Sequence, residues 1–199
     1  MHPVDVANRV IDSGAAETPH NRITNELTVV EDDVAVVESF SHCWVVDAGE
    51  GLVCWDASGV QSGPAMVEAL RAWSDLPVDR LVYTHGHVDH VGGSGAFVAD
   101  AERRGDRRPT FVAHEAVPAR FDRYRTTNGW NLAINQRQFG GIRNRDRLGI
   151  GGDGPRFLVD DVADPDELVG DHGSFTVGDR TFELRHARGE TDDHVWGWD

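Results

Sequence analysis

The chain has 199 residues, a length that suits one domain with a sizeable hydrophobic core. Its 39% hydrophobic and 27% charged residues are typical of a soluble globular protein, and no apolar run approaches the roughly 18 residues of a membrane-spanning helix. The 34 acidic residues outnumber the 19 basic ones, which are all arginine, and the net charge of −15 argues against binding to nucleic acid. Because the N-terminus lacks a basic stretch followed by an apolar core, we expect a cytoplasmic protein that acts on a small molecule and not at a membrane.

The N-terminal residues 1–22 are polar and aperiodic, which predicts a surface segment in front of a domain that covers residues 23–199. Two β-hairpins begin this domain. Their strands cover residues 27–30, 34–40, 43–46 and 52–55. Cys43 and Cys54 lie on the second hairpin, outside any metal-ligand spacing, and in a reducing compartment we expect two small buried residues rather than a disulfide.

Helices and strands alternate after the second hairpin. Ser62 can cap a helix whose apolar residues Met66, Leu70 and Trp73 fall on one face. The next predicted elements are a strand at 80–83, a helix at 96–104 and a strand at 110–113. This alternation implies parallel strands that are joined by helical crossovers. His114, at the end of the last strand, either faces a site there or caps the following helix.

Three histidines and an aspartate fall within six residues, directly after the apolar strand that ends at Tyr83. They are His85, His87, Asp89 and His90. If the strand stays extended, the first two side chains point the same way because side chains alternate, and the other two lie in the turn that follows. Imidazole and carboxylate groups are ligands of zinc, iron and manganese. A solvated histidine-rich turn or tag would lack the preceding strand, so the run predicts a site for one or two ions.

This run, followed by Gly92-Gly93, resembles the metal-binding signature of the metallo-β-lactamase fold superfamily. The resemblance implies an α/β (α+β) fold, the αββα sandwich, with a site for one or two Zn²⁺ ions between the edges of two sheets, or for iron or manganese instead. It leaves the substrate open, since the superfamily hydrolyses lactams, thioesters, phosphodiesters and sulfate esters and includes oxidoreductases. It also implies that Asp56 orients a ligand, because metal-bound histidines commonly donate their second N–H to a carboxylate. The alternative for Asp56 is a turn-forming residue before Ala57.

The least regular part of the sequence covers residues 126–156, and a loop of that length in a compact domain is usually functional or disordered. Its run Asn135-x-Arg137-x-Phe139-Gly140 resembles the alkylsulfatase-like branch of the superfamily. Because the planar guanidinium of arginine suits a pair of sulfate or carboxylate oxygens, Asn135 and Arg137 are predicted to bind substrate. The alternative is that Arg137 forms a structural ion pair.

A last hairpin is predicted from residues 175–177 and 181–186, and it places His186 on the same face as Phe182 and Leu184. A histidine on an apolar face is more often a core residue than a ligand. The following Ala187-Arg188-Gly189-Glu190-Thr191 run, however, resembles the third metal motif of the superfamily, a histidine at a strand end before a glycine turn. The resemblance therefore implies that His186 completes a site with His85 and His87. Alkylsulfatases are expected to use a glutamate here, so Glu190 is a rival ligand, and His194 is a further candidate.

The sequence ends at Asp199 within a predicted strand. We expect the first half of the αββα sandwich and the beginning of its second half, without the bridging aspartate and the last histidine that the resemblance implies. Exposed sheet edges would then favour homo-oligomers.

The predicted function is a metal-dependent hydrolase that uses a metal-activated water on a small anionic ester, with sulfate esters ahead of thioesters and lactones. Asp89 would act in catalysis by binding a second ion or orienting the water, and His90 would help to hold that ion. The alternatives are a mononuclear iron oxidoreductase of the same fold and a truncated module that binds metal without catalysis.

Overall fold

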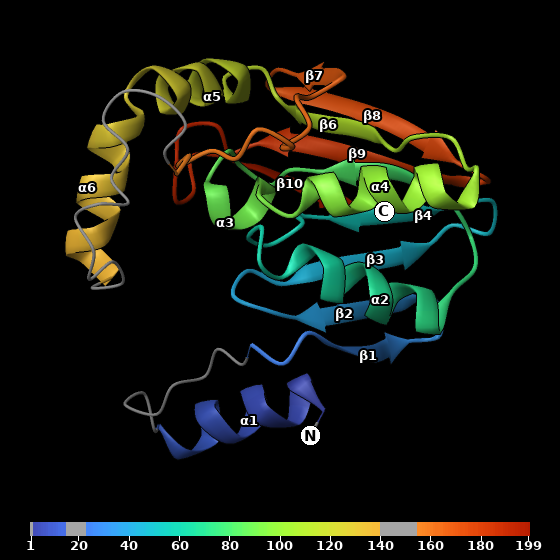
Figure 1. Ribbon diagram of the computed structural model, residues 1–199. Helices are drawn as coiled ribbons and strands as arrows, with labels where there is room; N and C mark the ends of the chain where they lie inside the picture. The colour runs from blue at the N-terminus through green and yellow to red at the C-terminus, as the bar shows by residue number, and fades with distance from the viewer. Residues whose placement is uncertain (1, 15–22, 140–154) are drawn as a thin grey trace.

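The larger of two β-sheets forms the centre of the molecule in the computed structural model, which describes residues 2–14, 23–139 and 155–199 (Figure 1). Its seven strands lie in chain order. They are β1 (Glu26–Glu31), β2 (Val34–Glu38), β3 (Cys43–Asp47), β4 (Leu52–Trp55), β5 (Val78–Val82), β6 (Thr110–His114) and β7 (Glu167–Val169). The first four strands pair antiparallel as two hairpins, and β4 to β7 pair parallel.

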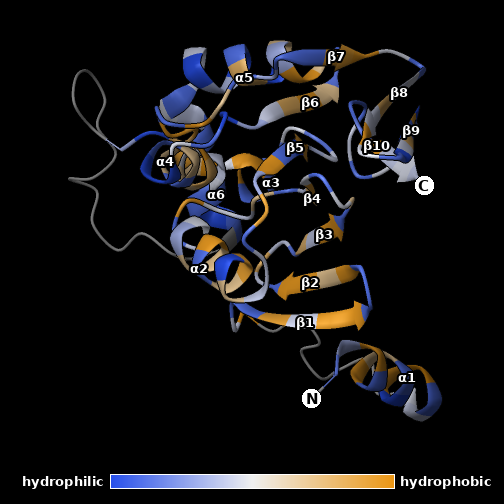
Figure 2. Cartoon of the chain, turned by 90° about the vertical axis from the view of Figure 1, so that its right-hand side faces the viewer, coloured by the Kyte–Doolittle hydropathy of each residue, from blue (hydrophilic) through white to orange (hydrophobic). Residues whose placement is uncertain are grey.

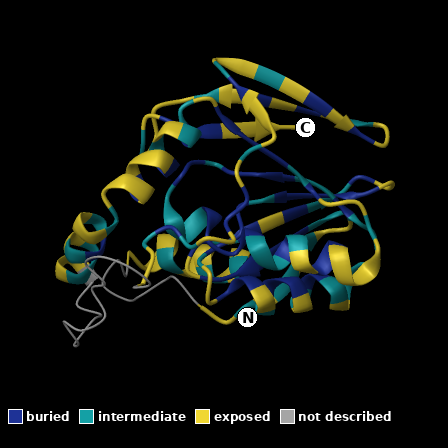
Figure 3. Ribbon diagram, turned by 45° about the horizontal axis from the view of Figure 1, so that its top comes forward, coloured by how far each residue is buried: buried dark blue, intermediate teal, exposed yellow. Residues whose placement is uncertain are grey.

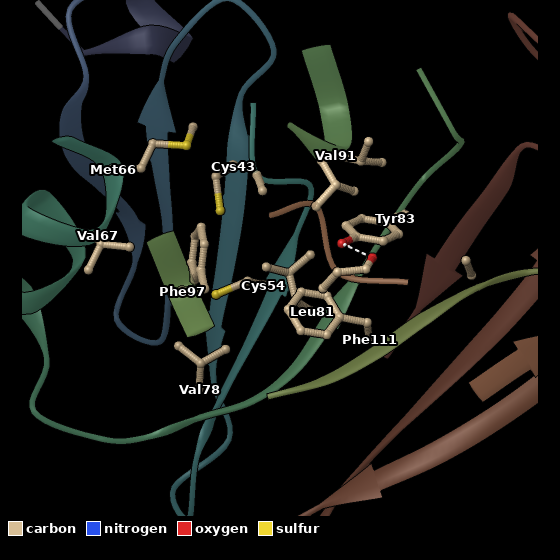
Figure 4. Packing of buried hydrophobic residues seen from close by; sticks show 14 of the residues in the cluster. Cys43, Cys54, Met66, Val67, Val78, Leu81, Tyr83, Val91, Phe97 and Phe111 are labelled. Carbon is tan, nitrogen blue, oxygen red and sulfur yellow. Dashed lines mark hydrogen bonds between the residues drawn. The ribbon is translucent and has the colours of Figure 1, made fainter. Parts of the chain in front are cut away.

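Two of the helices, α2 and α4, cover one face of this sheet, whereas α1 lies beyond its β1 edge, as Figure 2 shows. The helices are α1 (Pro3–Ser13), α2 (Gly63–Trp73), α3 (Val88–Val91), α4 (Ser94–Arg104), α5 (Val117–Thr126) and α6 (Asn128–Phe139). The larger hydrophobic core lies between α2, α4 and the sheet, where Met66 and Phe97 pack with Cys54 and Leu81 (Figure 4). The hydroxyl of Tyr83, which is buried in this core, donates to the carbonyl of Ala163 at 2.9 Å.

A three-stranded antiparallel sheet covers the other face. Its order is β10 (Val195–Trp198), β9 (Arg180–His186) and β8 (His172–Val177). Phe182 and Leu184 on β9 are buried against Val53 and Val82 of the larger sheet, whereas the strand residues that alternate with them are exposed. In Figure 3 the buried residues of the strands are dark blue, and the exposed segments at the periphery are yellow. The two sheets therefore enclose a second, smaller core.

Most of the predicted elements are confirmed. The four hairpin strands, the helices after Ser62 and Gly93, and the strands at 80–83 and 110–113 are present within a few residues of the predicted bounds. The parallel pairing of β4 with β5 and of β5 with β6 confirms the predicted crossovers. Cys43 and Cys54 are free and buried on neighbouring strands, as expected.

Two segments differ from the prediction. Residues 3–13, predicted to be aperiodic, form α1. The helix begins at Pro3, a residue suited to the first turn, and is capped by Gly14 in the left-handed conformation. Residues 128–139, predicted to be irregular, form α6, where the side-chain amide of Asn131 donates to both the carbonyl and the hydroxyl of Thr127. The pattern of α6 has almost no helical period and gave no signal, whereas in α1 the apolar residues Val4, Ala7 and Ile11 are spaced as on one face of a helix, so the prediction of an aperiodic segment was wrong there. The remainder of the predicted loop, residues 140–154, lies outside the described residues.

Among the described helices, none combines the length and the hydropathy that crossing a membrane would require.

Candidate metal centre

The histidine run lies at the C-terminal end of β5, where the strand leaves the sheet. The chain continues from Val82 through Tyr83 to His85 and then begins the short helix α3, with His87 as its N-terminal cap residue. The glycine pair after α3 packs directly on the backbone at the end of β4. A Cβ atom on Gly93 would lie 2.1 Å from the carbonyl oxygen of Ala57, so only glycine permits this approach. The turn is therefore fixed against the neighbouring strand.

His85, His87 and Glu190 form the one group of potential metal ligands found among the described residues, with their ligand atoms all within 4.8 Å of one another. Nε2 of His85 lies 3.1 Å from Nδ1 of His87, and that atom lies 3.3 Å from Oε1 of Glu190. His85 Nε2 lies 3.7 Å from Oε2 of Glu190. Ligands of a tetrahedral zinc ion at about 2.0–2.1 Å lie about 3.3 Å apart. Both the donor set and the separations therefore fit a divalent transition metal.

The environment keeps His85 neutral, which is the form that binds metal. Its side chain is 1% exposed, whereas Glu190 is 63% exposed at the outer side of the group. Burial, together with the neighbouring His90 and His87 rings, lowers the pKa of His85 to about 3. A neutral imidazole has a lone pair for an ion, so His85 needs no deprotonation near pH 7.

A second set of contacts surrounds Asp56, a buried residue with a φ of 64° at the end of β4. Its carboxylate accepts hydrogen bonds from the backbone N–H and the hydroxyl of Thr84, both at 2.7 Å, and from Nδ1 of His90 at 2.7 Å. The Thr84 hydroxyl also lies 3.1 Å from Nδ1 of His85. These contacts match the predicted orienting role of Asp56, because they leave Nε2 of both imidazoles available. The role itself stays a prediction.

The electrostatics of His90 differ from those of His85 although the two ring centroids are 4.1 Å apart. Burial alone would lower the pKa of His90, but the hydrogen bond and the charge of Asp56, with the charge of Asp89, outweigh it and raise the pKa. Asp89 is held in turn by the hydroxyl of Ser41, which donates to its Oδ2 at 3.0 Å. The same Oδ2 of Asp89 lies 3.7 Å from Nε2 of His90. The role of the two residues at a second ion stays a prediction.

His186 lies in a different environment from the one predicted. It does share a face with Phe182 and Leu184, but its ring stacks on His114 with centroids 4.1 Å apart. Its Nε2 lies 2.8 Å from the carbonyl oxygen of Asp192. The structure therefore does not bring His186 into the group of His85 and His87; the turn that follows β9 carries Glu190 there instead.

His114, the partner of that stack, accepts the N–H of Ala116 at 3.2 Å in the turn before α5. Ala116 is itself the N-cap residue of α5, and no side chain caps that helix, so His114 does not fill the predicted capping role. Burial and the neighbouring His186 lower the pKa of His114. His194 does approach the centre, since its ring stacks on that of His85 with centroids 4.9 Å apart. Its Nδ1 accepts the backbone N–H of Glu190 at 3.3 Å, so the ring supports the turn that bears this carboxylate.

The predicted substrate residues lie on α6, Asn135 partly exposed and Arg137 exposed. Neither belongs to the metal group of the described residues, and their roles stay predictions. Sequence reasoning missed Ser41, for which no motif gives a signal. It also missed Asp193, which is hidden in the acidic pair before His194.

Comparison with known proteins gives a consistent family. The model of the metallo-beta-lactamase superfamily matches residues 36–199. A linear primary-alkylsulfatase from Pseudomonas sp. (strain ATCC 19151) is 36% identical over 59 residues, which cover 29% of this chain and 11% of that protein.

Solved structures agree on the fold. The stereoselective inverting sec-alkylsulfatase Pisa1 from Pseudomonas sp. superimposes with a TM-score of 0.64 at 16% identity, over 86% of this chain and 29% of that one. A metallo-beta-lactamase with a HARLDQ motif from Cronobacter sakazakii gives 0.58 at 15% identity, over 88% and 57%. A B3 metallo-beta-lactamase described as having an active-site glutamic acid gives 0.57 at 18% identity, over 95% and 59%. The chain thus spans between about a tenth and three fifths of the length of these relatives.

Proposed function

Because the chain belongs to the metallo-beta-lactamase superfamily, we propose that it is a metal-dependent hydrolase whose primary ion is held by His85, His87 and Glu190. The observation that carries this proposal is the convergence of two imidazole nitrogens and a carboxylate oxygen within 4.8 Å. This ligand set differs from the sequence prediction only at its third member, where Glu190 takes the place that His186 was expected to fill.

A bound divalent ion would supply Lewis acidity and a water that ionises near neutral pH. Zinc is the metal we propose, since two histidines and a glutamate form a known catalytic zinc set. The protein's own contribution is to hold the ligands. Thr84 and Asp56 fix the rings of His85 and His90 through their Nδ1 atoms, so that the Nε2 atoms are directed away from the strand end.

Asp89 and His90 are proposed to hold a second ion or, for Asp89, to orient the attacking water. Ser41 fixes Oδ2 of Asp89 by donating its hydroxyl, and the same oxygen lies 3.7 Å from Nε2 of His90, where the two groups could share an ion. This arrangement is consistent with a carboxylate whose direction is set in advance of the reaction.

For the substrate, we propose a small anionic ester, with sulfate esters ahead of thioesters and lactones. Two observations support this choice. A linear primary-alkylsulfatase and the sec-alkylsulfatase Pisa1 are among the similar proteins, and Asn135 and Arg137 on α6 supply an amide and a guanidinium, which suit sulfate oxygens. The proposed location is the cytoplasm.

Metal binding is the most direct test, because it does not depend on the choice of substrate. The chain is stripped with a chelator and titrated with Zn²⁺ by calorimetry, and Glu190→Gln is compared with Glu183→Gln. Glu183 is similarly exposed and lies on the same hairpin, where it pairs with Arg185. We expect Glu190→Gln to weaken Zn²⁺ binding by at least about 10-fold and Glu183→Gln to leave it unchanged. Equal binding by both variants would refute Glu190 as a ligand.

Hydrolysis is measured next, with sulfate release from a primary alkyl sulfate compared with turnover of a thioester, a lactone and a β-lactam. Sulfate release that requires Zn²⁺ and falls in His87→Ala supports the proposed substrate class. Turnover confined to the thioester or the lactone would reject the preference for sulfate esters, and turnover confined to the β-lactam would reject the proposed class.

A mononuclear iron oxidoreductase is the second candidate, and one observation favours it: two histidines and one carboxylate are also the ligands of non-haem Fe(II) oxygenases. The metal content of the chain, purified from cells supplied with both metals, discriminates. Iron without zinc would favour the oxidoreductase.

A further inference from the structure

Asp193 is a charged residue in an unusual position, since its side chain is 0% exposed. Oδ2 accepts a hydrogen bond from Nε of Arg120 at 2.7 Å and from the backbone N–H of Gly86 at 3.2 Å. Oδ1 accepts a hydrogen bond from the hydroxyl of Thr191. Both oxygens of this buried carboxylate are thus satisfied by three different segments of the chain.

Two of those segments carry the proposed ligands. Gly86 lies between His85 and His87, and Thr191 follows Glu190. Arg120 comes from α5, and its second bond, from a terminal nitrogen to Oδ1 of Asp192 at 2.6 Å, reaches the same turn. The carboxylate of Asp193 therefore connects the glutamate turn to the histidine segment through the N–H of Gly86 and to α5 through the guanidinium of Arg120.

The packing around Gly86 shows that the approach is close. A Cβ atom at this position would lie 2.8 Å from Cδ of Arg120 and 3.0 Å from Oδ2 of Asp193. Burial alone would raise the pKa of Asp193, but the hydrogen bonds from Arg120 and Thr191 outweigh it and hold the pKa below its ordinary value. The carboxylate is therefore charged whenever the protein is folded near neutral pH.

The ends of the glutamate turn are fixed independently of this pair. The N–H of Ala187 donates to the carbonyl of His194 at 3.0 Å, and the N–H of Val195 donates to the carbonyl of Thr84 at 2.7 Å. These backbone hydrogen bonds hold the two ends of the turn, and the contacts of Asp193 hold its middle, which carries the proposed ligand Glu190.

We propose that Asp193 and Arg120 are positioning residues for the metal centre, which clamp the Glu190 turn against the His85–Gly86–His87 segment. The inference rests on the proposed metal site but concerns residues that bind no ion themselves. The clamp acts through geometry: it sets the separation between Glu190 and the two imidazoles before any ion arrives, and so removes part of the ordering cost of binding.

The chain offers a matched control in the pair of Arg71 and Asp100. Its Nε and Oδ2 atoms are also 2.7 Å apart, with side chains 15% and 6% exposed against 13% and 0% in the clamp. It joins α2 to α4 instead of the ligand segments. Asp100→Asn should therefore impose a similar structural penalty without touching the proposed centre.

The experiment compares Asp193→Asn, Asp100→Asn and the unmodified chain by Zn²⁺ titration and by amide hydrogen exchange of the metal-free protein. We expect Asp193→Asn to weaken Zn²⁺ binding by about 10- to 100-fold, as loss of an outer contact to a ligand typically does, and Asp100→Asn to leave it unchanged. Arg120→Lys keeps the charge but loses the planar set of donors, so its Zn²⁺ affinity should lie between those of Asp193→Asn and Asp100→Asn. Exchange should accelerate in residues 84–88 and 187–195 of Asp193→Asn only.

The outcomes separate this inference from the proposed function. Equal Zn²⁺ affinity, or equal exchange in those two segments, for Asp193→Asn and Asp100→Asn would overturn the clamp. If the unmodified chain binds no Zn²⁺, the proposed function fails, while the exchange comparison still decides whether Asp193 holds the turn.

Discussion

The substitution Asp56→Asn isolates the contribution of one buried carboxylate to the fold around the histidine run. Asn is the suitable replacement because, among non-glycine residues, it tolerates the positive φ of 64° at this position well. Its Oδ1 retains the bond from the N–H of Thr84. Its amide nitrogen cannot accept from the Thr84 hydroxyl or from Nδ1 of His90, which are the two contacts of Oδ2.

The expected loss follows from these two contacts. A hydrogen bond to a charged group contributes about 1.5–3 kcal/mol, but the Thr84 hydroxyl can rotate to accept from the new amide. We therefore expect a decrease of about 2–4 kcal/mol in the free energy of unfolding, which corresponds to a fall of roughly 5–15 °C in Tm for a domain of this size.

The loss should also depend on pH. The pKa of His90 is raised in the folded protein, so the stability that it contributes is fully present below its unfolded pKa of about 6.5 and is lost as the pH rises through the folded value. The difference between the two proteins should therefore be larger at about pH 5.5 than at about pH 8.5.

Urea unfolding in the presence of a chelator measures both quantities, and the NMR titration of His90 gives its pKa directly. Asp47→Asn is the control, because the exposed turn it caps needs only Oδ1, which accepts the N–H of Gly49 at 2.8 Å. It should change stability by less than about 0.5 kcal/mol. A deficit of Asp56→Asn that is the same at both pH values would refute the coupling between Asp56 and His90.

Two further predictions concern packing. Gly93→Ala should lower the free energy of unfolding by about 3 kcal/mol or more, because its Cβ would meet the backbone of Ala57. Gly129→Ala, whose Cβ would meet nothing within 4 Å, should raise the free energy of unfolding by about 0.5 kcal/mol. Urea unfolding of both variants tests this pair, and equal effects would contradict the contact with Ala57. Both thiols are buried, and the hydrogen bond with Cys54 together with burial raises the pKa of the Cys43 thiol. Neither cysteine should therefore react with iodoacetamide at about pH 8 until guanidinium unfolds the chain. Mass spectrometry reads the adducts, and rapid modification of the native protein would disprove the burial of the thiols.

Sequence alone could predict the parts of the centre that depend on local geometry. His85, His87, Asp89 and His90 are adjacent at one strand end, so their proximity needs only the alternation of side chains and a turn. The parity of His186 with Phe182 and Leu184 is equally local, and it is confirmed.

The third member of the centre depends on long-range geometry. Whether His186 or Glu190 reaches the histidine pair is decided by how the small sheet lies on the large one and by the course of the turn after β9. The ring of His186 stacks on His114, and its Nε2 lies within hydrogen-bond distance of the carbonyl oxygen of Asp192. No rule of sequence spacing reveals these contacts. The polar helix α6 escaped prediction for a related reason, since few of its residues face a core that would impose a period. Helix α1 does show apolar residues at helical spacing, although none of its residues is buried.

The assembly of the centre from two separate sheets has a consequence for how such a protein can diversify. The histidine pair is built into β5 and the glycine pair behind it, where a change disturbs the main core. The carboxylate, in contrast, sits on a short turn whose ends are closed by their own backbone bonds. Rewriting that turn can exchange one donor for another, and with it the preferred ion, while the scaffold beneath it keeps its shape.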